Sequence, residues 1–185
     1  LSCKYSASDI AMDLVARVKD NFDHIDESKV QKMLYFAQAQ YLHANDKPLF
    51  SDKILASENG PMVESVRNDY SIYDGEIQGP FTIKIDSLLL DLVVKYYSRA
   101  LGKKLEDVSK SDLPWSSATN KGAVLGKEIK INDISNILDC EDAFVNDLHL
   151  RTSLAWSFGR KGISPGHEVE VYCYKTKTHK KVSIA

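Results

Sequence analysis

Apolar residues between positions 29 and 45 recur on two sides of a helix. At about 100° per residue, a broad stripe and an opposite patch appear. The stripe consists of Val30, Met33, Leu34, Phe36, Ala37, Tyr41 and Ala44, and the patch of Tyr35, Ala39 and Leu42. A helix apolar on two sides needs neighbours on both. The helix should begin at Asp26 or Ser28 and end near Asn45, where turn formers precede Pro48.

The segments on either side of this helix also show clear patterns. Before it, Ser6 or Ser8 can cap an amphipathic helix whose apolar face is Ile10, Leu14, Val15, Val18 and Phe22. After it, an extended piece from Ile54 to Glu58 leads into Asn59-Gly60-Pro61. Pro61 is expected in the first turn of a further helix, because its missing N–H costs nothing there. That helix would carry Met62, Val63, Val66 and Tyr70 on one face.

The middle of the chain alternates short strands and helices. We expect a strand from Phe81 to Ile85, a largely apolar helix from Leu88 to Leu101 capped by Asp86 and ended by Gly102, and a short amphipathic piece around Leu105 to Val108. Pro114 should stand near the start of a helical turn. A strand from Lys127 to Ile131 and a closing helix from Asp133 to Leu138 complete this part.

The pattern changes after residue 141. Apolar residues fall at every second position from Leu148 to Phe158, and alternation returns at 169–173 and 182–184. This predicts a three-stranded antiparallel meander, which should pack on the helical part or on a partner. The predicted fold is α+β and mostly α: a helical bundle with a small antiparallel sheet over 1–141, and a C-terminal β meander over 142–185.

Composition and charge narrow the function classes. The 185 residues are 43% hydrophobic and 27% charged, with a formal net charge of −2. Such a balance is ordinary for a soluble globular protein and argues against nucleic acid or an anionic membrane as a partner. The run from Leu88 to Leu101 is too short and too charged to span a membrane. Cys3, Cys140 and Cys173 lack metal-ligand spacing, so a reducing cytoplasm fits best.

No motif for catalysis, cofactor binding or metal binding is present in the sequence. The five histidines are scattered outside any HExxH-like pattern, and no glycine-rich loop has the context of a phosphate site. Cys140 stands beside Glu141 and Asp142, whose negative charge disfavours a thiolate. We therefore expect a protein that is not an enzyme and that has no cofactor and no metal.

Four short motifs, in order, resemble the SocA-like antitoxins, also called the Panacea domain. A "K.QK.LYFAQ" helix corresponds to residues 29–38 and "KPLF" to residues 47–50. A "GP.V..V" turn starts at Gly60-Pro61, and "PW..A" starts at Pro114-Trp115. The resemblance spans about residues 7 to 140. It implies an antitoxin that binds a cognate protein toxin encoded next to it.

Two surfaces are candidates for binding this partner. The first is the C-terminal meander, with Trp156, Phe158, Tyr172 and Tyr174 as aromatic anchors and an edge strand for pairing. The second consists of Lys29, Lys32 and Tyr35; in the simplest interpretation the lysines are solvated charges and Tyr35 packs in the core or at its rim, as does Trp115.

Gly60, Pro61, Pro114 and Trp115 are expected to be structural. For Gly60-Pro61, a strand-to-helix turn is favoured, and a free helix N-terminus that binds an anion is the alternative.

Other functions remain open from the sequence. The protein could act as an adaptor that delivers the toxin to an AAA+ protease of the ClpXP type, or as a phage or mobile-element protein that binds a host factor. Self-association into a homo-oligomer is a further possibility. DNA binding is the weakest alternative, because no helix-turn-helix with a basic recognition helix is visible.

Overall fold

The computed structural model describes residues 3, 5–19, 25–72, 87–98, 100 and 102–134, and the backbone of 168–173 and 178–183. The element order is α1 (Ala7–Lys19), α2 (Glu27–Asn45), β1 (Ile54–Ser57), β2 (Gly60–Val63), α3 (Glu64–Ile72), α4 (Ser87–Tyr97), α5 (Gly102–Ser111), α6 (Leu113–Ala118), β3 (Glu128–Ile129), α7 (Ile131–Ile134), β4 (Glu168–Cys173) and β5 (Thr178–Ser183). The described part is mostly helical with a small antiparallel sheet, as predicted.

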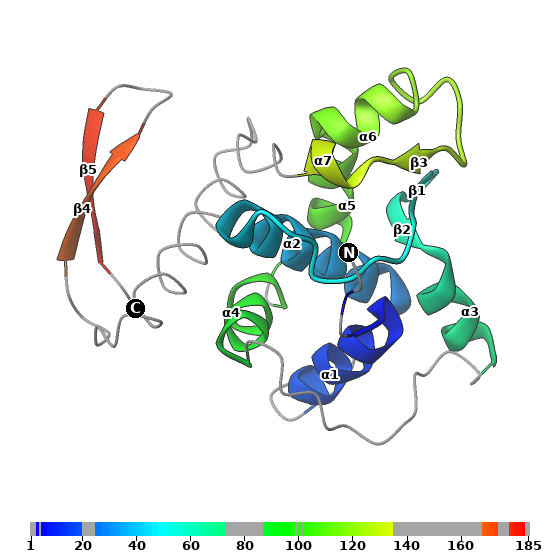
Figure 1. Ribbon diagram of the computed structural model, residues 1–185, viewed down its shortest axis with the longest axis horizontal. Helices are drawn as coiled ribbons and strands as arrows, with labels where there is room; N and C mark the ends of the chain where they lie inside the picture. Colours follow the sequence, from blue (N-terminus) through cyan, green and yellow to red (C-terminus); the bar gives the residue numbers. More distant parts are fainter. Residues whose placement is uncertain are drawn as a thin grey trace.

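Helix α2 runs through the middle of the helical part, with α1 and α4 on one side and α5 to α7 on the other (Figure 1). All residues from 30 to 40 are buried, which confirms that the helix has neighbours around it. Its ends also lie where the sequence places them. The Asp26 side chain accepts a hydrogen bond from the Lys29 N–H at 2.7 Å, and Asp46 closes the C-terminus in the left-handed region with φ of 52°.

Helices α1 and α4 cover α2 with the apolar faces that their sequences predict. Leu89, Leu90 and Val93 of α4 are fully buried, and Tyr97 stacks on Phe36 of α2 with ring centroids 5.2 Å apart. Arg17 of α1 contacts both Asp13 and Asp91, so an ion pair also joins α1 to α4.

The three-stranded sheet has the order β2-β1-β3, and both pairs are antiparallel. Strands β1 and β2 form a hairpin in which Ser57 pairs with Gly60, so only Glu58 and Asn59 connect them. The prediction that Pro61 lies in the first turn of a helix is wrong. Pro61, Met62 and Val63 belong to β2, and α3 begins at Glu64. Proline is tolerated there because β2 is an edge strand.

Other boundaries differ from the predictions. Helix α4 ends at Tyr97, and Gly102 begins α5 instead of ending α4. Helix α7 starts at Ile131, two residues before the predicted start, and 135–138 lie outside the described residues. The strand around 127–131 is confirmed as β3, although it is only two residues long.

Some predicted elements cannot be compared with the structure. The strand from Phe81 to Ile85 and the strand from Leu148 to Phe158 lie outside the described residues. Strands β4 and β5 pair with each other antiparallel, from Glu168 opposite Ser183 to Cys173 opposite Thr178. Figure 1 shows this hairpin to one side of the helical part. Its packing on the helices or on a partner stays a prediction.

The loop between α2 and β1 is fixed by a buried glutamine of α2. Gln38 is fully buried; its amide nitrogen donates to the carbonyl of Phe50 at 2.9 Å, and its oxygen accepts from the N–H of Leu49 at 2.8 Å. A weaker third bond comes from the Phe50 N–H at 3.3 Å. One side chain therefore satisfies the buried backbone of the "KPLF" segment.

Replacing Gln38 by Met should lower the free energy of unfolding by about 2–4 kcal/mol, because buried backbone groups of Leu49 and Phe50 lose their partners. Urea denaturation followed by circular dichroism measures this change. The control Ser51→Ala alters an exposed side chain of the same loop and should stay within about 0.5 kcal/mol. Equal stability of Gln38→Met and wild type would contradict the assigned role.

Candidate functional site

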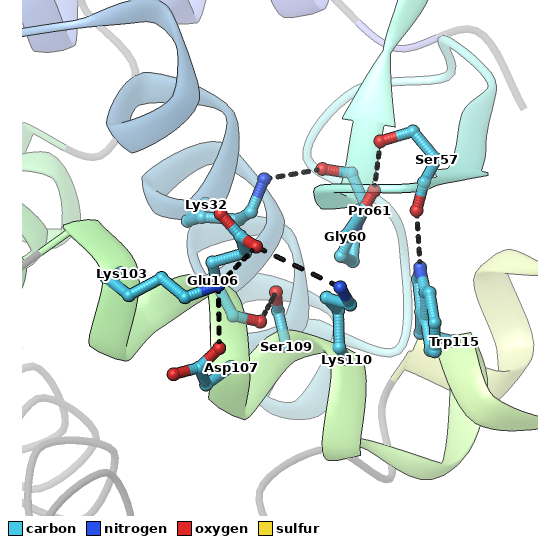
Figure 2. A network of polar contacts seen from close by, with 10 residues as sticks. All are labelled: Lys32, Ser57, Gly60, Pro61, Lys103, Glu106, Asp107, Ser109, Lys110 and Trp115. Carbon is cyan, nitrogen blue, oxygen red and sulfur yellow. Dashed lines mark hydrogen bonds and ion pairs between the residues drawn. The ribbon is translucent and has the colours of Figure 1, made fainter. Parts of the chain in front are cut away.

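Lys32 lies where α2, the β1–β2 hairpin and α5 meet (Figure 2). Its side chain is only 2% exposed. The Nζ atom donates one long hydrogen bond, 3.4 Å, to the carbonyl oxygen of Pro61. An ammonium group has three N–H donors, and within the described residues Lys32 uses its ammonium for this one hydrogen bond.

Gly60 brings the hairpin against this lysine. Its φ of +99° lies in the region that side chains rarely adopt. A Cβ at this position would stand 2.7 Å from the Ser109 hydroxyl and 3.0 Å from Cε of Lys32. Glycine is thus required here both by the backbone conformation and by the close approach of α2 and α5.

The charges around Lys32 come from both helices. Glu106 of α5 forms ion pairs with Lys103 at 2.9 Å and with Lys110 at 3.9 Å (Figure 2). Burial lowers the pKa of Lys32 to about 8, and the negative charges of Glu106, Glu27 and Asp26 oppose this shift only in part. A substantial fraction of Lys32 is therefore neutral slightly above physiological pH.

The tip of the hairpin is held by Trp115 of α6. The indole Nε1 donates to the backbone carbonyl of Ser57 at 3.1 Å, and the Ser57 hydroxyl donates to the carbonyl of Gly60 at 2.7 Å. The Lys110 ammonium lies 5.7 Å from the centre of the indole ring. Pro114 and Trp115 are buried, and their structural role stays a prediction.

An open pocket of about 250 Å³ lies between the first turns of α2 and the hairpin tip. Its walls carry two acidic and two basic side chains together with polar groups, including Glu27, Gln31, Lys32, Ser57, Glu58 and Arg67. The base of the hairpin is fixed by Gln31, whose amide nitrogen donates to the carbonyl of Val63 at 3.1 Å and whose oxygen accepts from the Val63 N–H at 2.8 Å. Gln31 thus pairs with the outer edge of β2 as a neighbouring strand would.

The structure brings together only some of the predicted site residues. Lys29 is half-buried, and its ammonium donates to the carbonyl of Ser98; burial lowers its pKa, whereas Asp26 raises it. The interpretation of Lys32 as a solvated charge is wrong, because α5 and the hairpin cover it. Tyr35 is 1% exposed, as its core interpretation predicts, and burial raises the pKa of its hydroxyl. A direct contact of Tyr35 with a partner stays a prediction that this burial does not support.

The C-terminal candidates are placed less completely. The backbone of Tyr172 lies in β4, whereas Trp156, Phe158 and Tyr174 lie outside the described residues. The anion-binding alternative for Gly60-Pro61 is wrong in its original form, since these residues form a strand and not a helix N-terminus. The pocket was not predicted from the sequence. The Asn59-Gly60 pair, which favours tight hairpins, was the available signal.

No group of histidine, cysteine and acidic side chains in the described part of the chain could hold a metal ion. Within the same residues, none of the helices has both the length and the apolar character needed to cross a membrane.

The part of the chain that contains this site matches a known protein family. Residues 30–116 match the family described as antitoxin SocA-like, Panacea domain. The match covers a little under half of the chain and confirms the predicted resemblance. It extends from α2 into α6 and includes Lys32, the hairpin and Trp115. Neither the curated proteins nor the solved structures contain a match.

Gly60→Ala should destabilise the protein by about 2–4 kcal/mol, because it adds backbone strain and a clash with Ser109 and Lys32. Thermal or urea unfolding measures the loss. Adding Ser109→Ala should recover part of it by removing the nearest atom, while the backbone strain remains. The control Gly102→Ala places a Cβ in open space and should cost less than about 0.5 kcal/mol. Equal effects at Gly60 and Gly102 would contradict the close approach.

Lys32→Met should make the free energy of unfolding less dependent on pH. The unfolded chain keeps the Lys32 proton up to the ordinary pKa of 10.5, whereas the folded protein releases it near 8. Deprotonation therefore favours the folded state between these values, and wild type should gain on the order of 3 kcal/mol relative to Lys32→Met as pH rises through that window. Urea denaturation of both proteins at several pH values from 7 to 10 tests this. A stability difference independent of pH would show that Lys32 titrates as an ordinary lysine.

Proposed function

We propose that the protein is an antitoxin that neutralises a toxin encoded next to it by direct binding. The observation that carries the proposal is the match of residues 30–116 to the SocA-like antitoxin family. The matched segment includes most of α2 together with the β1–β2 hairpin and α5, which pack against one another. The family relationship supports a role in a toxin-antitoxin system. Direct binding of the toxin is a more specific mechanism than this family relationship implies.

Neutralisation by binding requires a surface that covers the toxin's active site or holds an inactive conformation of it. A stable complex of this kind normally buries about 1,200–2,000 Å² in total. The C-terminal segment with Trp156, Phe158, Tyr172 and Tyr174 lies outside the matched residues, so it could distinguish one toxin from another. In this proposal it supplies aromatic anchors and a strand edge, and no catalytic step is required of the protein.

Expression of the neighbouring gene product alone should stop growth, and co-expression of this protein should restore it. The two proteins should also purify together in a fixed ratio. The control is the Gln38→Met variant, which is expected to be less stable. If its rescue of growth falls only as much as the amount of folded protein falls, the loss of rescue is an effect of stability. A neighbour that is harmless on its own would contradict the proposal.

The same assay separates binding from delivery to a protease. In a host that lacks the AAA+ proteases of the ClpXP type, direct binding predicts full rescue and an unchanged toxin level. Rescue that disappears in this host, together with a rise in toxin level, would instead identify the protein as a proteolytic adaptor.

A further inference from the structure

The pocket beside the hairpin tip combines a buried cation with open space. Lys32 lines the pocket but is 2% exposed, and its ammonium has a single hydrogen bond of 3.4 Å among the described residues. A buried ammonium with unused donors is costly unless it is paired. Burial lowers its pKa, and the negative charges of Glu106, Glu27 and Asp26 oppose this shift only in part. An anionic group that enters the pocket would provide the missing partner.

The remaining charges of the pocket restrict which anion fits. Glu27 and Glu58 line the same walls as Lys32 and Arg67, so two carboxylates balance two cations. A phosphate group, with close to two negative charges, would meet repulsion from both acids. A single carboxylate near Lys32 satisfies the ammonium, and N–H groups of the same ligand can donate to the acids at the rim.

A peptide segment with an acidic side chain has this combination of groups. Its carboxylate carries one negative charge, and its backbone N–H groups are donors. The pocket volume of about 250 Å³ also leaves room for one side chain with part of its backbone. The hairpin that forms one wall is held at its tip by Trp115 and at its base by Gln31, so the pocket is preformed.

We propose that this pocket binds an acidic side chain of the protein partner through the ammonium of Lys32. The inference rests on the proposed function in one respect, namely that the partner is the toxin. Glu58 and Arg67, at the exposed rim, then orient the segment that carries the acidic side chain. Recognition would thus involve the matched family domain as well as the C-terminal segment.

The test uses the full chain and two probes, the peptides acetyl-Ala-Glu-Ala-amide and acetyl-Ala-Gln-Ala-amide. They are titrated into protein that contains ¹³C-labelled lysine, and the ε-carbon signal of Lys32 is followed by NMR, with Lys32→Met used to assign it. The glutamate peptide should bind about tenfold more tightly or better than the glutamine peptide. It should also raise the pKa of Lys32, because a nearby carboxylate favours the charged amine.

Two variants show whether Lys32 carries the effect. Lys32→Met should abolish the preference for the glutamate peptide, whereas Lys95→Met, at an exposed position on α4, should leave it unchanged. Equal binding of the two peptides, or a preference that survives Lys32→Met, would overturn the inference. If Lys32→Met does not fold, the comparison of the two peptides on wild type and Lys95→Met decides alone.

The peptide titration involves no toxin, so its failure is distinct from failure of the proposed function. A harmless neighbouring gene product together with a positive titration would reject the toxin as partner and keep the carboxylate pocket. A toxic and neutralised neighbour together with a negative titration would reject the pocket. In the pair that co-purifies, Lys32→Met should weaken binding about tenfold or more, with Lys95→Met as the control.

Discussion

The fold depends on the burial of helix α2 on all sides. Eleven consecutive positions, 30 to 40, are buried, and four of them carry polar side chains. Buried polar groups must find hydrogen-bond partners or the folded state loses several kcal/mol. In this protein the partners of Gln31, Lys32 and Gln38 are backbone groups of the segment that follows α2. The central helix therefore determines the path of the chain up to residue 63.

This arrangement explains the sequence pattern of residues 29–38 in physical terms. Gln31 binds the edge of β2, Lys32 contacts the carbonyl of Pro61, and Gln38 holds the loop at Leu49 and Phe50. The "K.QK.LYFAQ" segment thus supplies side chains, and the later "KPLF" and "GP" segments or the residues next to them supply the backbone groups that these side chains bond. Replacing Gln31 or Gln38 leaves buried backbone groups of the loop or hairpin without partners.

Periodicity predicted the helices well because their burial follows from the helix repeat alone. The two-sided apolar pattern of α2 and the single face of α1 both correspond to observed contacts. The prediction failed at Pro61, because the preference of proline for the first turn of a helix is a local rule. Pairing with β1 depends on residues several positions away, and in this protein it determines the conformation of Pro61. The Asn59-Gly60 pair indicates a hairpin but not the pocket beside it, because Glu27, Glu58 and Arg67 meet only after the hairpin folds onto α2.

Lys32 differs from the glutamines of α2 in one respect that matters for function. Gln31 and Gln38 are neutral, and each bonds the backbone through both its amide nitrogen and its oxygen, which offsets the cost of burying them. A lysine at such a position is charged and has more donors than the hairpin supplies. A methionine would fill similar volume without the cost of a buried charge, and it would give up only the long hydrogen bond to the carbonyl of Pro61. A ligand that pairs with the cation gives a stronger reason for a lysine here, because the stability lost in the free protein is recovered on binding.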